Sequence, residues 1–257
     1  MRRRGWVVVA ALVTATVAQP QDGGRHSLFT EVLRAHVSNG LVDYNGVAGD
    51  PKFGRYLVQL ARTNPDSIAG RNERLALWIN AYNAYTIKLI IDEQPETSIR
   101  DISLGLPVLF GPWSVSFANV GGTEYTLNEI EHDIIREQFR DARIHSALVC
   151  ASMSCPKLRE GAYEGAVLDC QLDEEAERFI NDPVLNRFDT ADGTVTISRI
   201  FDWYESDFEE DAGSVRLFLA RYVTDPEAKK LLWSEDLEFD YFPYDWSLNA
   251  RPGNMQK

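Results

Sequence analysis

The sequence predicts one α+β domain, in which a buried central helix packs on a small antiparallel sheet. Of the 257 residues, 44% are hydrophobic, which is enough for a large core. The segment 72–92 is apolar on nearly all sides, which is typical of a helix at the centre of a domain. No internal repeat and no low-complexity linker interrupts the chain. We therefore expect the domain to span residues 27–250.

The first 18 residues, MRRRGWVVVAALVTATVA, have the layout of a secretory signal peptide. Three arginines precede an apolar run that ends in small residues, and this run is short for a membrane span. We expect a signal peptide over residues 1–18, a secreted or periplasmic protein, and no stable membrane insertion after cleavage. An uncleaved membrane anchor is the alternative.

The formal net charge of −13 makes nucleic acid and anionic membrane surfaces poor partners. The expected partner is instead an unidentified peptide or small-molecule substrate. No cofactor and no metal ion is expected.

Two helices are expected before the central one. Leu28, Val32 and Leu33 share one face of a helix over 27–37, and a second helix is expected over 53–62.

Asparagines mark the central helix. Asn72 is expected to cap its start, and Asn80 and Asn83 lie three residues apart on one buried face. A buried amide needs hydrogen-bond partners, and holding the backbone of a loop is its commonest role. In the functional alternative, Asn80, Tyr82 or Asn83 orients an imidazole or holds a carbonyl or carboxylate of a substrate.

The next predicted elements are a hairpin, formed by 113–117 and 123–127, and a helix that ends near Phe139. Thr126, followed three residues later by Glu129, has the pattern of a capping box at the start of this helix.

The same helix carries Glu131, His132 and Arg136, and helical spacing puts His132 and Arg136 on one side. Arg136 is expected to bind a carboxylate of the substrate or to pair with a nearby acidic residue.

The stretch from Arg143 to Arg159, RIHSALVCASMSCPKLR, holds two of the three cysteines. We expect 144–150 to form a strand and Pro156 to open a helix, because proline is favoured at the first helical position. Cys155 is then the N-cap, where free amide groups and the helix dipole stabilise a thiolate. The same amide groups can form an oxyanion hole.

These expectations define a catalytic hypothesis. Cys155 is the nucleophile, His145 is the general base, and Glu131 or His132 orients the base. Cys150 is the rival nucleophile, although strand alternation places it on the face opposite His145.

Three other interpretations of these residues stay open. Cys150 can be a small core residue, or it can form a disulfide with Cys155 across a tight loop. His132, His145 and the two cysteines can also supply four zinc ligands, although their spacing matches no compact zinc motif. With three cysteines, at least one stays unpaired within the chain.

The last third of the chain completes the α+β pattern. Helices are expected over 172–181, 198–204 and 215–223, and strands over 194–197 and 237–246.

Six blocks of this sequence resemble the signature of the family called domain of unknown function 547. They are GLVDY (40–44), WINAYNAYTIKLI (78–90), NEIEHDIIR (128–136), RIHSALVCASMSCPKL (143–158), ISRIFDWYESDF (197–208) and YDWSLN (244–249). The blocks occur in the family's order, and the resemblance covers about residues 28–249.

The resemblance implies a fold similar to that of papain-like and transglutaminase-like cysteine hydrolases, with a site made of cysteine, histidine and an acid. The residues that match the family's blocks are Asn80, Tyr82, Asn83, Glu131, His132, Arg136, His145, Cys150 and Cys155.

Two functional hypotheses follow. The first is a cysteine-dependent hydrolase of a peptide or amide bond. The second is a non-enzymatic module that holds a carboxylated peptide or cell-wall fragment through Arg136, Asn80 and Asn83. A sulfur within about 4 Å of an imidazole nitrogen in an open cleft favours the enzyme. A closed disulfide between Cys150 and Cys155 favours the module.

Overall fold

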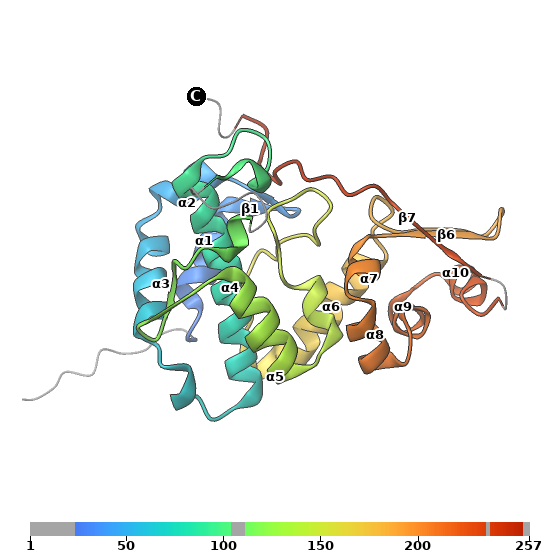
Figure 1. Ribbon diagram of the computed structural model, residues 1–257, viewed down its shortest axis with the longest axis horizontal. Coiled ribbons are helices and arrows are strands. Elements are labelled where there is room, and N and C mark those ends of the chain that lie inside the picture. The colour runs from blue at the N-terminus through green and yellow to red at the C-terminus, as the bar shows by residue number, and fades with distance from the viewer. Residues whose placement is uncertain (1–23, 104–110, 235–236, 254–257) are drawn as a thin grey trace, which may run out of the picture.

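The computed structural model describes residues 24–103, 111–234 and 237–253. The predicted signal peptide, residues 1–18, lies outside them. Figure 1 shows helices α1 to α6 gathered around α4, with α7 to α10 and strands β6 and β7 beside them. The α+β class predicted from the sequence is confirmed.

Helices make up most of the described chain. The α-helices are α1 (Ser27–His36), α2 (Tyr44–Gly49), α3 (Pro51–Arg62), α4 (Arg71–Glu93), α5 (Glu137–Phe139), α6 (Leu168–Ile180), α7 (Ile200–Trp203), α8 (Glu205–Ala212), α9 (Val215–Tyr222) and α10 (Pro226–Leu231). Short 3₁₀ segments are η1 (Pro65–Ser67), η2 (Ile99–Asp101), η3 (Pro112–Ser114), η5 (Ala142–Ser146) and η6 (Gly165–Val167), and η4 (Glu129–Arg136) is a π-helix.

The strands are short and form three separate sheets. They are β1 (Val37–Ser38), β2 (Leu41–Val42), β3 (Ala118–Val120), β4 (Thr123–Tyr125), β5 (Arg187–Asp189), β6 (Thr194–Ile197) and β7 (Phe239–Tyr241). Strands β1 and β2 pair antiparallel, as do β3 and β4, whereas β6 pairs antiparallel with β5 and parallel with β7.

Helix α4 is the centre of the fold, since every residue from Leu75 to Ile87 is buried. It packs against α2, α6, η4 and η6, and it meets the sheets through β3. The predicted central helix is therefore confirmed, but helices and loops cover most of it instead of one small antiparallel sheet.

The start of α4 differs from the prediction. The helix begins at Arg71 and Gly70 is its N-cap, so Asn72 already lies inside the first turn. The Asn72 amide instead donates a hydrogen bond to Asp169 on α6 (3.0 Å).

The buried side chains form two hydrophobic clusters. The larger cluster surrounds α4, and the smaller one gathers around the end of α6, β6 and α7 to α9. The chain passes between the two clusters at η5 and in the loop that follows it, which places the residues of the cysteine-rich stretch where the clusters meet.

The predicted hairpin and capping box are both present. The first strand of the hairpin is β3, five residues later than the predicted start at 113, because Gly121 and Gly122 form a two-residue turn with φ of 65° and 86°. Thr126 Oγ1 accepts a hydrogen bond from the Glu129 amide (3.0 Å), and the Glu129 carboxylate accepts one from the Thr126 amide (2.7 Å).

The strand predicted over 144–150 is wrong. Residues 142–146 form the 3₁₀ segment η5, and the chain then runs on without a strand partner. The side chain of Asn83 takes the partner's place: its amide nitrogen donates to the Ala147 carbonyl (2.9 Å) and its oxygen accepts the Val149 amide (2.9 Å). Without a strand, His145 and Cys150 are not placed on opposite faces by strand alternation.

The helix predicted to open at Pro156 is also wrong. The amide groups of Met153 and Ser154 pair with the carbonyl groups of Ser247 (2.8 Å) and Asp245 (3.2 Å), which holds this loop against the C-terminal segment. After Pro156 the chain forms no helix, and residue 158 makes an isolated antiparallel bridge with residue 40. Cys155 is consequently not a helix N-cap, and the predicted oxyanion hole is lost with the helix.

The last third of the chain agrees with the prediction in outline. Helix α6 begins four residues before 172, α9 and β6 match their predicted ranges closely, and Ser198 Oγ accepts the amide of Ile200 (3.3 Å) at the start of α7. Of the strand predicted over 237–246, only β7 pairs in the sheet. Helix α8 is not predicted by the sequence analysis. No helix among the described residues combines the length and the apolarity that crossing a bilayer needs.

Asn83→Ala should lower the free energy of unfolding by about 3 kcal/mol, because it leaves two buried backbone groups of the 147–149 loop unpaired. Asn72→Ala, at the outer side of the same helix, should lower it by no more than about 0.5 kcal/mol. Urea unfolding of both variants measures the difference, and equal losses would contradict this role of Asn83.

Candidate functional site

A pocket of about 210 Å³ lies between the two hydrophobic clusters, with lining residues from both. Its walls are mostly aromatic: Tyr82, Trp113, Trp203, Tyr204, Tyr244 and Trp246. Its polar lining consists of Asn128, Glu131, His132 and His145, together with Cys150 and Cys155. The pocket thus brings together one carboxylate, two imidazoles and two sulfurs in apolar surroundings.

A chain of charged contacts supports the imidazole of His145. His145 Nε2 donates to the Asp207 carboxylate on α8 (2.7 Å), since an ionised carboxylate can only accept. The guanidinium of Arg136 holds both oxygens of the same carboxylate (2.6 and 2.7 Å). His145 is 4% exposed, so this contact fixes the orientation of a buried ring.

Asp207 stays ionised because of these partners. Burial alone raises the pKa of Asp207, but hydrogen bonds from Arg136 and His145 outweigh burial and hold this pKa far below its usual range. When the Nε2–H group of His145 points at Asp207, the lone pair of the neutral ring lies on Nδ1. His145 then has the tautomer and orientation that a general base needs.

Tyr204 contacts both His145 and Glu131. Its ring stacks on His145, with 4.0 Å between ring centroids and 28° between ring planes. Its hydroxyl donates to the Glu131 carboxylate (2.6 Å). Burial first, and then the charge of Glu131, raise the pKa of Tyr204, so its hydroxyl remains a donor.

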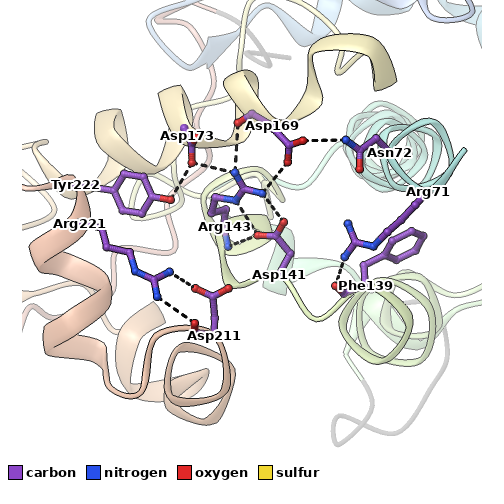
Figure 2. Close-up of polar contacts among 10 residues, drawn as sticks. All are labelled: Arg71, Asn72, Phe139, Asp141, Arg143, Asp169, Asp173, Asp211, Arg221 and Tyr222. Atoms are coloured by element: carbon purple, nitrogen blue, oxygen red, sulfur yellow. Dashed lines mark hydrogen bonds and ion pairs between the residues drawn. The ribbon is translucent and has the colours of Figure 1, made fainter.

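Salt bridges around Arg143 fix the segment that carries His145. Figure 2 shows the Arg143 guanidinium among three carboxylates: Asp141 at the start of η5 (2.7 Å), Asp169 (3.0 Å) and Asp173 (2.9 Å) of α6. The Asp141 side chain also accepts the Arg143 amide (3.1 Å) and so caps η5. The position of His145, two residues further on, therefore depends on contacts with α6.

Cys150 and Cys155 form a disulfide at the wall of the pocket. The Cys155 sulfur accepts the amide of Cys150 (2.9 Å) and the hydroxyl of Tyr244 (3.3 Å). Ser152 in turn donates its hydroxyl to that of Tyr244 (3.0 Å). Of the interpretations that the sequence leaves open, the structure shows the disulfide, and Cys170 is exposed and free.

The disulfide removes two of the four ligands from the zinc interpretation, because a thiolate is needed to bind the metal. Within the ranges that the structure describes, no group of three or more His, Cys, Asp or Glu side chains is placed to hold a metal ion.

The structure brings together some of the predicted site residues and separates others. Tyr82, Glu131, His132, His145, Cys150 and Cys155 line the pocket. Asn80 and Asn83 do not line it, since their amides hold the backbone of Tyr163 and of the 147–149 loop. Arg136 lies behind His145 and is committed to Asp207, while its Nη1 donates to His132 Nδ1 (3.0 Å).

Sequence reasoning misses the acid that pairs with His145. Glu131 or His132 is predicted to orient this base, but Asp207 does so across 62 positions of sequence. Asp207 and Tyr204 lie in the block ISRIFDWYESDF, and Tyr244 and Trp246 lie in YDWSLN. Both blocks stand out in the sequence, so a search of them for an acid and for aromatic partners could have found these residues.

The fold and the pocket define an α+β protein with a paired histidine and carboxylate beside a disulfide. Residues 65–180 match the model of a family described as protein of unknown function, DUF547, which supports membership of that family. The match includes α4, η4, η5 and the disulfide loop, and it ends before α7 and α8. No curated protein and no solved structure matches the chain significantly. The expected similarity to papain-like and transglutaminase-like hydrolases therefore gains no support from the comparisons.

Asp207→Asn should lower the free energy of unfolding at neutral pH by about 2 kcal/mol, because Arg136 and His145 lose a charged partner. The pKa of Asp207 is lower in the folded chain than its ordinary 3.8, so its stabilisation is complete above that value. The stabilisation is lost as the pH falls through the folded pKa, and the two proteins should then converge.

Urea unfolding at a series of pH values measures this effect. Glu210→Gln is the matched control, because Glu210 lies on α8 like Asp207 and forms an exposed ion pair with Arg140. It should cost less than about 1 kcal/mol. A difference for Asp207→Asn that does not shrink in acid would contradict the assignment.

Proposed function

We propose that the reduced protein is a thiol-dependent hydrolase of a peptide or amide bond. The observation that carries this proposal is that His145, which is paired with Asp207, lines the same pocket as Cys150 and Cys155. Arg136 holds Asp207 in turn. An imidazole oriented by a carboxylate beside a thiol is the arrangement that activates a cysteine nucleophile.

In the proposed reaction, Cys155 is the nucleophile and His145 the base. His145 Nδ1 takes the thiol proton, and the sulfur attacks the acyl carbon. The C–N bond breaks as the amine leaves with the proton from His145, which leaves a thioester. Water, deprotonated by His145, then hydrolyses the thioester and restores the thiol.

The contacts of the two sulfurs support Cys155 as the nucleophile. Two donors, the Cys150 amide and the Tyr244 hydroxyl, point at the Cys155 sulfur, and both favour a thiolate. These two donors would stabilise the Cys155 thiolate, the role that the sequence analysis expects of a helix N-terminus. Cys150 is more exposed and remains the rival, since its sulfur also lies 3.2 Å from the Tyr244 hydroxyl.

Reduction is part of the proposal because a disulfide has no nucleophilic thiolate. A small dithiol reductant supplies two electrons and two protons, forms a mixed disulfide with one sulfur and leaves as its own disulfide. The proposal also includes export, supported by the signal-like layout of residues 1–18. The expected location is the periplasm or the outside of the cell.

The second candidate is a non-enzymatic binding module, which the closed disulfide favours. Its predicted anchor for a carboxylate does not fit, because Arg136 is occupied by Asp207 and His132. A module built on this pocket would therefore bind its ligand through the aromatic walls and not through a carboxylate.

Cysteine variants separate the two candidates in a screen of fluorogenic peptide and amide substrates. The parent should hydrolyse a substrate only with reductant, whereas Cys150→Ala should be active without it because Cys155 no longer has a disulfide partner at position 150. Cys155→Ala should lose activity by at least about a thousandfold under both conditions.

Cys170→Ala is the control, since this exposed cysteine lies outside the pocket, and it should behave like the parent. Activity in Cys155→Ala and not in Cys150→Ala would exchange the roles of the two cysteines. Hydrolysis that survives unchanged in both variants would contradict a thiol mechanism, and no hydrolysis by any reduced protein would leave the binding module.

A further inference from the structure

Glu131 is a buried carboxylate that lines the pocket. Its residue is 7% exposed, and the hydroxyl of Tyr204 donates to one oxygen (2.6 Å). Tyr82 is a second neighbouring phenol: burial first, and the charge of Glu131 next, raise the pKa of Tyr82 well above its ordinary value. Both phenols therefore stay protonated, and the carboxylate of Glu131 has the Tyr204 hydroxyl as its hydrogen-bond donor.

No basic side chain among the described residues forms an ion pair with Glu131. Arg136 interacts electrostatically with Glu131. Its guanidinium, however, is hydrogen-bonded to Asp207 and His132 and not to Glu131. A buried charge without a counter-charge is costly, and a pocket wall is a place where a bound cation can supply one. Because His145 is bound to Asp207, Glu131 is also free of the orienting role predicted for it.

The walls around Glu131 are made of clustered aromatic rings. Tyr244 and Trp246 lie with their centroids 4.5 Å apart, Trp203 and Tyr244 4.7 Å apart, and Trp113 and Trp246 6.0 Å apart. Trp203 is 47% exposed, so part of this aromatic wall is open to solvent. Ring faces are electron-rich and attract organic cations, most strongly alkylated ammonium groups.

Two rings of the pocket wall already have a cation over them. The guanidinium of Arg136 lies 5.0 Å from the centroid of Tyr204, and that of Arg100 lies 5.1 Å from the centroid of Trp246. The lining of the pocket itself includes no lysine and no arginine. The pocket thus combines aromatic walls and one carboxylate with no lysine or arginine in its lining.

We infer that the pocket binds an alkylated ammonium group, which lies against the aromatic walls and neutralises Glu131. An anionic ligand is unfavourable there, because it would face the carboxylate without a basic partner. A bare metal ion is also a poor occupant, since the described side chains offer no cluster of metal ligands. The inference rests on the proposed function in one respect: the ammonium group is part of the substrate only if the protein is the proposed hydrolase. Binding of the group does not require catalysis.

The test uses the oxidised protein, which cannot hydrolyse a substrate, so binding is measured apart from activity. The probe is choline, and the matched neutral ligand is its carbon isostere, in which a tert-butyl group replaces the trimethylammonium group. Titration is followed by calorimetry and by the fluorescence of the pocket tryptophans. Choline should bind at least about tenfold more tightly than the isostere.

Two variants of η4 separate the role of Glu131 from a general effect of charge. Glu131→Gln retains an oxygen for the Tyr204 hydroxyl and should weaken choline binding about tenfold. Asp133→Asn removes the same charge at an exposed position two residues away and should leave binding within about twofold. Trp203→Ala, at a partly exposed ring, should weaken choline binding several-fold even if Glu131→Gln fails to fold.

Equal affinity for choline and its isostere would overturn the inference, and so would equal effects of Glu131→Gln and Asp133→Asn. Unchanged choline binding in Trp203→Ala would also overturn it. If choline fails to bind while Cys150→Ala hydrolyses amides, the inference is wrong and the hydrolase stands. If choline binds as expected and no variant hydrolyses anything, the hydrolase is wrong and the ligand class stands.

Discussion

The contact between His145 and Asp207 holds the two halves of the site together. His145 belongs to η5 at the edge of the larger cluster, and Asp207 belongs to α8, which packs in the smaller cluster. Arg136 of η4 binds the same carboxylate of Asp207. The contact turns the imidazole so that Nε2 faces the carboxylate. It also brings α7 and α8 to the pocket, and with them the ring of Tyr204 that stacks on His145.

A second constraint comes from the contacts that hold the loops on either side of Cys150. Asn83 holds the loop after η5 from the central helix, and the C-terminal segment holds the loop between the cysteines. Both cysteines consequently lie at the pocket wall without a strand or helix to carry them. Ala151, between them, has a φ of 63°, an uncommon conformation for alanine, and its carbonyl accepts the amide of Asn249 (3.1 Å).

What the sequence predicts correctly is mostly local. The central helix, the capping box of Thr126 and Glu129, and the burial of Asn80 and Asn83 follow from spacing along a few turns. The apolar run 144–150 has the composition of a strand. Composition does not reveal that the side chain of Asn83 supplies the hydrogen bonds that a neighbouring strand would supply. The pairing of His145 with Asp207 depends on a helix that the sequence analysis does not predict and on a distant contact, which single-sequence patterns do not encode.

The central claim is that Asp207 holds His145 as the tautomer with its proton on Nε2 and its lone pair on Nδ1. Nitrogen-15 NMR of the histidine side chains, in the parent and in Asp207→Asn, measures this directly. The account predicts that neutral His145 in the parent shows a protonated Nε2 and a bare Nδ1, and that Asp207→Asn weakens this preference. A proton on Nδ1 in the parent, or the same tautomer ratio in both proteins, would contradict it.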